Sequence, residues 1–396
     1  MNRFILSLAT LFILGATIFS EDSRRSAVIP ASTNNDSSQS AVKAVTSIPA
    51  PRSLASGTLN TAKEVRPAIA KGKRIPGRRV TFINGHVAKL GPAHLCDDWE
   101  AFLRTKVFPR LGPTGASKSD RVGTIVLTDR YGLKRPLKGI SPYINFVGEH
   151  PVAFHGGNSY GFYVTDEFEG DVVLAWDPTL SRGKTHWHSN FGAGIENVFI
   201  TSKDGVDGVH FVGAQQASRI RNVFIRGFGS AVGLKLAGDT FSVSDVFIDS
   251  SVGKTRIAEG STGILQEDES LVSVIFSNVT IHNCEVGVAL TRAESVIFDL
   301  LETEHVRTNI VIKQQATNVF FRNCNFRHIS RALLDLEVVK HPGAFKLTID
   351  AVARGKAIAI LPDRSEKPLT NWALIPKRSS APGLVEVDSR ELLKPD

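Results

Sequence analysis

IENVFIT (195–201), IRNVFIR (220–226) and VSDVFID (243–249) are near-copies of one seven-residue pattern. A fold with a single central core gives a chain no reason to repeat itself at a fixed period, whereas stacked structural units do. We use the Asn or Asp at the third position as a marker. It recurs at steps of 25, 23, 33, 22 and 23 residues, at Asn197, Asn222, Asp245, Asn278, Leu300 (in the equivalent place) and Asn323.

A second, weaker repeat follows each marker by about ten residues. Its copies are GVHF (208), GLKL (233), GILQ (263), GVAL (287), NIVI (309) and ALLD (332). Short Val-, Ile- and Phe-rich runs between Gly, Ser and Asn indicate strands, and no helical period is present. Such a unit cannot bury its apolar face alone, so neighbours must stack. We expect an all-β fold, a parallel β-helix solenoid.

The segment before the repeats, RVGTIVLTDRYGLKRPLKGISPYINFVGEH (121–150), carries Gly123–Leu127, Tyr131–Leu133 and Ile144–Gly148 in the order Gly-x-φ-φ-φ, Tyr-x-φ, φ-x-φ-x-Gly. In this order the chain resembles the right-handed parallel β-helix proteins of the pectate lyase (pectin lyase-like) superfamily. The resemblance covers roughly 97–340. It implies that DDWEAFLRTKVF (97–108), an amphipathic helix with Asp97 or Asp98 as N-cap, plugs the first coil.

The catalytic motifs of that superfamily are not present. THWHS (185–189) is not Trp-x-Asp-His, and DGVDGVHF (204–211) is followed by neither an Asp-Asp pair nor Gly-His-Gly. No catalytic residue is therefore carried over by motif, because one solenoid serves many reactions. The HWH triplet lacks a third ligand, so we expect no metal site and no cofactor; calcium is not supported by a motif.

The two ends of the chain differ from the repeats. Residues 1–20 have a basic start and a short apolar run, which predicts a secretory signal peptide and a secreted, periplasmic or cell-surface protein. Residues 21–78, rich in Ser, Ala and Pro, predict a disordered linker. A single domain is expected over 79–396, with an N-terminal cap and first coils (79–190), regular coils (191–340) and an irregular C-terminal cap (341–396).

Composition restricts the partners only weakly. The formal charge is +8, but residues 191–340 hold 14 Lys plus Arg and 17 Asp plus Glu, so that 14 − 17 = −3. The basic excess thus lies outside the repeats and does not indicate a nucleic-acid partner. Three scattered cysteines predict neither a disulfide framework nor a metal centre. No later segment is long and apolar enough to span a membrane.

Strand alternation assigns side chains to columns along the solenoid axis. Counting the marker as zero, positions +1 and +3 are Val or Ile in most copies and face inward. Position +2 then faces outward and holds Phe199, Phe224, Phe247, Thr280, Glu302 and Asn325. Position +4 also faces outward and holds Thr201, Arg226, Asp249, His282, Glu304 and Arg327, and the turn after it adds His305 and His328. The outward column of the second strand is mostly apolar: His210, Lys235, Leu265, Ala289, Val311 and Leu334.

The resemblance to the pectate lyase superfamily, together with the Arg and His side chains of position +4, implies a polysaccharide-active enzyme, a lyase on an acidic glycan rather than a hydrolase. For a lyase, His282 is the candidate base, Arg226 and Arg327 neutralise a uronate carboxylate, and His305 or His328 protonates the leaving oxygen. For an inverting hydrolase, Asp249 and Glu304 lie two coils apart, about 9.6 Å. The predicted substrate-binding residues are Phe199, Phe224, Phe247, Thr201, Glu302 and Asn325. A third hypothesis is a non-catalytic glycan-binding or structural rod, in which these columns are only solvated.

Overall fold

The computed structural model describes residues 77–83, 85–111, 123–141, 143–152, 159–177, 192–253, 257–337, 345–369 and 383–388. All of them belong to one compact unit. The predicted signal peptide and nearly all of the predicted linker lie outside these residues, as does the HWH triplet. Those boundaries therefore remain predictions. Among the described residues, no helix has the length and apolarity needed to cross a membrane.

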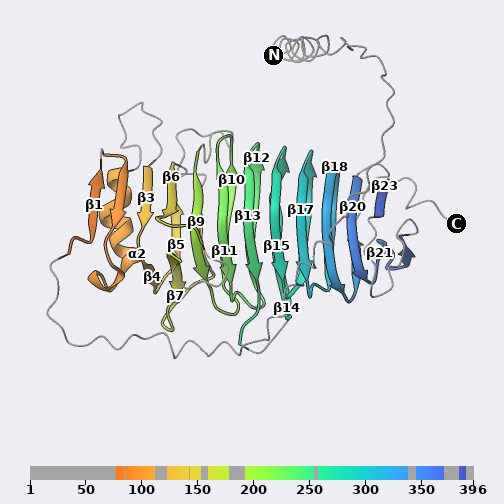
Figure 1. Cartoon of the computed structure of the whole chain (residues 1–396), viewed down its shortest axis with the longest axis horizontal. Helices are drawn as coiled ribbons and strands as arrows, with labels where there is room; N and C mark the ends of the chain where they lie inside the picture. The colour runs from red at the N-terminus through yellow and green to blue at the C-terminus, as the bar shows by residue number, and fades with distance from the viewer. Residues whose placement is uncertain are drawn as a thin grey trace, which may run out of the picture. The chain divides into compact units, whose positions relative to one another are not determined.

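The described residues form a right-handed parallel β-helix, as predicted (Figure 1). In the first coils, three short strands per turn form three parallel sheets. The first sheet contains β2 (Val87–Leu90), β3 (Gly123–Leu127) and β6 (Ile144–Gly148), and the second contains β4 (Arg130–Leu133) and β7 (Gly161–Val164). The third contains β5 (Leu137–Ile140), β8 (Val172–Trp176), β10 (Asp207–Ala214), β12 (Val232–Asp239), β14 (Ala258–Val272), β16 (Cys284–Glu294), the start of β18 (Thr308–Ile329), β19 (Ala332–Leu336) and β21 (Ile358–Ile360).

In the later coils, one bent strand replaces the separate strands of the first and second sheets. These strands are β9 (Gly194–Thr201), β11 (Arg219–Arg226), β13 (Ser242–Asp249), β15 (Ile275–His282), β17 (Ile297–Glu304), the end of β18 and β20 (Phe345–Gly355). The first half of β9 pairs with β6 and its second half with β7, so the bend joins two sheets. The bend is the marker residue, which is left-handed in the six coils from β9 to the end of β18: φ is 57° at Asn197, 59° at Leu300 and 53° at Asn323.

The interior is filled by columns of apolar side chains. Val198 and Ile200, at positions +1 and +3, are fully buried, as are their counterparts in the following coils. Position −2 is also inward, and Phe276, Phe298 and Phe321 stack there with centroid distances of 4.3 and 4.7 Å. Because each coil presents the same shape to the next, like side chains stack on like.

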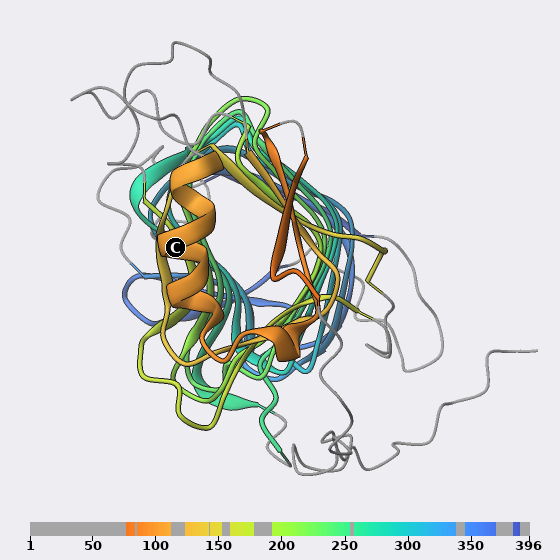
Figure 2. The ribbon, with the colours of Figure 1, turned by 90° about the vertical axis from the view of Figure 1, so that its left-hand side faces the viewer.

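A helix covers the N-terminal end of the core, as the resemblance implied (Figure 2). It follows the short turn η2 (Ala93–Leu95) and runs through α2 (Trp99–Phe102), η3 (Leu103–Val107) and α3 (Phe108–Leu111). Asp98 is its N-cap, and the carboxylate accepts a hydrogen bond from the Ala101 amide at 3.0 Å. Trp99 is 2% exposed and meets the Tyr131 ring edge-on at 4.7 Å.

Antiparallel strands lie at both ends of the described solenoid. β1 (Val80–Ile83) pairs with β2 at the N-terminal end. At the C-terminal end, β22 (Glu366–Pro368) pairs with β21, and β23 (Gly383–Asp388) pairs with β20. These antiparallel pairings end the parallel repeat at both ends of the solenoid. An unpaired edge strand at either end could otherwise pair with a strand of another chain.

The register predicted for the last copy of the second strand is wrong by one residue. Val311 pairs with Asp335, and Leu334 pairs with the inward Ile310. Asp335 is 3% exposed and forms ion pairs with Arg331 (3.4 Å) and Arg364 (3.0 Å). All five residues of β19 are buried, so the alternation that set the register elsewhere is absent here.

Candidate functional site

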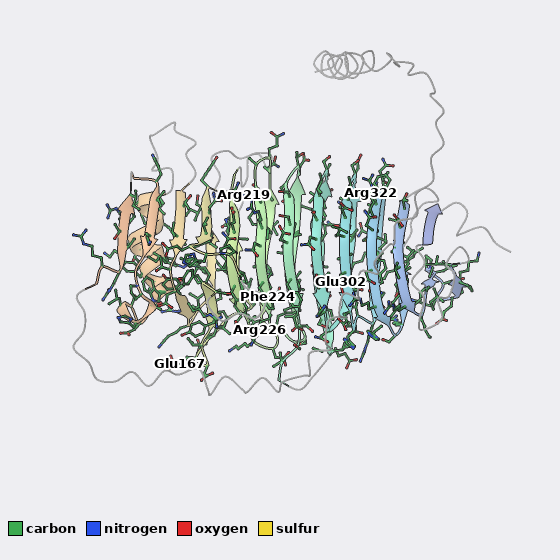
Figure 3. All side chains as sticks on the ribbon, viewed as in Figure 1. Glu167, Arg219, Phe224, Arg226, Glu302 and Arg322 are labelled. Carbon is green, nitrogen blue, oxygen red and sulfur yellow. The ribbon has the colours of Figure 1, made fainter. Side chains whose placement is uncertain are left out.

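Two outward columns of the bent strands run in the register that the sequence indicated. At position +4, strand pairing places Arg226 beside Asp249, Asp249 beside His282, His282 beside Glu304, and Glu304 beside Arg327. At position +2 it links Phe199, Phe224, Phe247, Thr280, Glu302 and Asn325 in the same way. Figure 3 labels Phe224 and Arg226 on β11 and Glu302 further along the solenoid.

The three phenylalanines of position +2 pack chiefly on one another. Phe199 and Phe224 stack with ring centroids 4.8 Å apart, and Phe224 and Phe247 with centroids 4.5 Å apart. The guanidinium carbon of Arg130 lies 4.9 Å from the Phe199 centroid, and Phe199 is only 4% exposed. The role of Phe199, Phe224 and Phe247 in substrate binding therefore stays a prediction. Stacking on adjacent coils occupies the faces and leaves edges for solvent.

A groove of about 600 Å³ runs along the bend of the strands. It crosses four coils and is lined by Pro151, Val152, Asn197, Arg221, Asn222, Val223, Phe224, Asp245, Val246, Phe247, Asn278 and Thr280. Side-chain hydrogen bonds link marker residues along it: the Asn222 amide donates to Asn197 at 2.7 Å, and the Asn278 amide donates to Asp245 at 2.8 Å. The groove thus combines a row of amides and a carboxylate with two aromatic edges.

His282 is the centre of a second cluster beside the groove. Its ring meets Phe247, which also lines the groove, edge-on at 4.7 Å. Its Nε2 lies 3.7 Å from a Glu304 carboxylate oxygen. Burial lowers the pKa of His282, while the charges of Glu304 and Asp249 act in the opposite direction. The lowered pKa keeps the imidazole neutral at neutral pH, the form in which it accepts a proton.

The charged partners proposed for His282 are held by their own neighbours. Asp249 accepts hydrogen bonds from the Ser251 amide (3.0 Å) and from the Asn283 side chain (2.8 Å). Arg327 forms an ion pair with Glu302 at 3.0 Å. Arg226 lies 5.7 Å from the Phe199 ring centroid, toward the start of the groove. The two arginines therefore flank the cluster without contacting His282.

The remaining predicted residues lie at the margins. Thr201 pairs with Tyr163 of β7 and with Arg226 of β11, at the groove's first coil. Asn325 lies beside Glu302, beyond the groove, where its amide oxygen can accept from the Arg327 guanidinium at 2.9 Å. The structure thus separates the +2 column into a groove part, Phe224 to Thr280, and a polar part outside the groove, Glu302 and Asn325.

His305 and His328 are neighbours. Their rings are parallel within 5° and their centroids are 4.7 Å apart. His305 Nδ1 also lies 3.8 Å from Glu304. Glu304, His305 and His328 each direct one potential ligand atom into a space where these atoms lie within 4.8 Å of one another.

Sequence reasoning missed both the groove and this three-residue group. Pro151 and Val152 come from an early coil, so the repeat pattern alone does not bring them to the markers. The group was within reach, because His305 and His328 hold the same position in successive coils and Glu304 precedes His305.

Comparison with solved structures adds distant likenesses. No protein-family model matches the chain, and no curated protein matches it. Among solved structures it is similar to the phiAB6 tailspike, in complex with three-repeated oligosaccharides of an Acinetobacter baumannii surface polysaccharide, with 11% identity and a TM-score of 0.29 over 65% of this chain. The chain spans about half of that tailspike, since the match covers 52% of it. It is also similar to PfbA, a surface adhesin of Streptococcus pneumoniae, with 10% identity and a TM-score of 0.14 over 63% of this chain and 86% of PfbA.

Proposed function

We propose that this chain is an exported protein that binds a linear polysaccharide in the groove along the bends of β9, β11, β13 and β15. The observation that carries the proposal is the groove itself, which repeats one set of polar groups on four successive coils. Export rests on the predicted signal peptide. Membership of the pectate lyase superfamily is part of the proposal, and the pattern over Gly123–Gly148 supports it.

The lining of the groove matches the chemistry of a sugar polymer. Asn197, Asn222 and Asn278 offer amide donors and acceptors, Asp245 offers a carboxylate, and sugar hydroxyls can pair with both kinds of group. The edges of Phe224 and Phe247 supply apolar contact for the sugar ring. Because the coils are about 4.8 Å apart, the same contacts recur along the axis, which suits a ligand that is itself a repeat.

Affinity gels with immobilised glycans test the groove through two matched variants. Asn278→Gly removes a groove amide and keeps a residue that tolerates the left-handed backbone at φ 54°. Asn323→Gly makes the same change at φ 53°, beyond the groove, where the amide likewise donates to one carboxylate, that of Asp299. Binding should weaken by roughly 2- to 13-fold for Asn278→Gly, the loss of one hydrogen bond, and stay unchanged for Asn323→Gly. Equal effects of the two changes would show that the sugar does not bind in the groove.

For the chemistry beside the groove, we propose cleavage by β-elimination, with His282 as the base that removes the C5 proton of a uronate. Phe247 supports this assignment because it contacts both the groove and the His282 ring. Arg226 and Arg327 lie on either side to attract the sugar carboxylate. His305 or His328 then protonates the leaving oxygen. His282→Ala removes the base and should abolish the formation of unsaturated uronate.

A second mechanism is favoured by the acidic surroundings of His282. Asp249 and Glu304 occupy the coils on either side of it, and Glu302 lies two residues from Glu304. Three carboxylates repel an acidic sugar more than a neutral one. With Asp249 and Glu304 about 9.6 Å apart along the axis, the pair suits inverting hydrolysis. Asp249→Asn and Glu304→Gln would each abolish this reaction.

A further inference from the structure

The group of Glu304, His305 and His328 combines one carboxylate with two imidazoles. In the described part of the chain, these three side chains are the ones whose potential ligand atoms converge, within 4.8 Å of one another. Glu304 and His305 are half-buried at the end of β17, and His328 is exposed at the end of β18. The group therefore opens to solvent on one side and rests on the solenoid on the other.

The backbone fixes the direction of both histidines. His305 and His328 are left-handed, with φ of 55° and 58°, at the same position of successive coils. Asn283 holds that position one coil earlier with φ of 60°. Because equal backbone conformations on adjacent rungs aim their side chains alike, the two rings lie parallel at 4.7 Å, close to the strand spacing.

The charge around the group favours a cation. Glu304 lies within 3.8 Å of both His282 and His305. Arg327, its neighbour in the next coil, is paired with Glu302 instead, at 3.0 Å. The Arg327 guanidinium is therefore paired with Glu302 and not with Glu304.

We propose that Glu304, His305 and His328 bind a divalent transition-metal ion, for which zinc is the representative probe. Imidazole nitrogen and carboxylate oxygen are zinc ligands at about 2.0–2.2 Å, whereas calcium and magnesium prefer oxygen alone. Three protein ligands leave at least one position for water or a ligand oxygen. Tetrahedral ligands at these distances lie roughly 3.4 Å apart. Ligand atoms up to 4.8 Å apart must therefore approach one another, and exposed His328 has room to turn.

The metal proposal stands apart from glycan binding and cleavage. A metal-bound Glu304 would no longer serve in the hydrolase pair with Asp249, and the cation would lie beside His282, where the lyase mechanism needs positive charge. Metal binding is measurable without any sugar, so its failure and the failure of the glycan proposal are separate results.

The test is calorimetric titration of the untagged full chain with zinc chloride. His305→Asn and His328→Asn remove one imidazole each and keep a residue suited to the left-handed backbone, as Asn283 shows. His150→Asn is the matched control, an exposed histidine outside the group. Circular dichroism verifies that each variant is folded.

Wild type and His150→Asn should bind one zinc ion that each of the other two variants loses. The expected loss of affinity exceeds the roughly 10- to 100-fold that follows removal of an outer-shell partner. Calcium should not compete for this ion. The proposal is overturned if wild type binds no zinc, or if His305→Asn and His328→Asn bind it as tightly and in the same number as wild type.

Discussion

At the scale of single residues, one backbone conformation organises the molecule. The marker residue is left-handed in the six coils from β9 to the end of β18, and this joins two sheets through one bent strand. Asn and Asp tolerate the left-handed conformation better than other residues except glycine, which explains why they recur at the marker position. Leu300 is the exception, with φ of 59° and an apolar side chain that is 51% exposed.

Leu300→Asn should therefore stabilise the protein by about 1 kcal/mol, since it relieves left-handed strain without removing a buried contact. The reverse change, Asn278→Leu, should destabilise it by a similar amount. The free energy of unfolding, measured in denaturant, checks both. A Leu300→Asn protein less stable than wild type would show that the leucine makes a contact worth more than the strain it costs.

The cysteines differ in reactivity because they differ in burial. Burial raises the pKa of Cys324 to about 12, and it raises the pKa of Cys284 still further. Neither forms an appreciable thiolate at pH 8. A thiol reagent should label only half-buried Cys96 in the native protein and all three cysteines after unfolding. Rapid labelling of all three thiols in the native protein would contradict the burial of Cys284 and Cys324.

At the scale of elements, each coil is held by like side chains stacked on those of its neighbours. Phe298 is the middle ring of an inward stack of three, between Phe276 and Phe321, and is fully buried. Its loss leaves a cavity bordered by two coils that cannot close on each other, because strand pairing fixes their spacing.

Phe298→Ala should accordingly destabilise the protein by about 3–5 kcal/mol. Phe247→Ala is the comparison on the outward face, where it removes the last ring of a stack beside the groove. Phe247→Ala should lower the free energy of unfolding by less than Phe298→Ala does. Thermal unfolding of both variants measures the difference. Equal losses would mean that the outward stack contributes as much as the core.

The sequence predicts the strand register where inward apolar and outward polar side chains alternate. Around Leu300 the marker is lost, yet Glu302 and Glu304 hold the predicted register because the inward Leu301 and Thr303 continue the pattern. At β19 five buried residues follow one another, so the alternation of buried and exposed residues does not define the register. Asp335 therefore pairs with Val311, the position predicted for Leu334. The buried charge is satisfied by Arg364, a distant residue that no local pattern reveals.

The candidate site was predictable only in part for the same reason. Columns follow from register, and His282, Asp249 and Glu304 lie where the repeat places them. Which faces are open does not follow from register, because Arg130 of an early coil covers Phe199. Convergence of Glu304, His305 and His328 depends on side-chain direction, which an outward or inward label does not give.

At the scale of the whole molecule, the solenoid presents a periodic surface. The groove crosses the coils of β9, β11, β13 and β15, and the ionisable cluster lies beside it on β13 and β15 and continues onto β17 and β18. A polymer lying along the axis therefore reaches the groove and the whole cluster. Binding in the groove and cleavage beside it are in this account two parts of one surface.

The most direct measurement is to incubate the purified protein with pectate, alginate, hyaluronan, chondroitin sulfate and neutral glycans while following reducing ends and the ultraviolet absorbance of unsaturated uronate together. The account predicts both signals on an acidic glycan, abolished by His282→Ala and retained by Asn323→Gly. New reducing ends without ultraviolet absorbance would instead indicate hydrolysis by Asp249 and Glu304. No new ends on any glycan bound by the affinity gels would contradict cleavage and leave a binding protein.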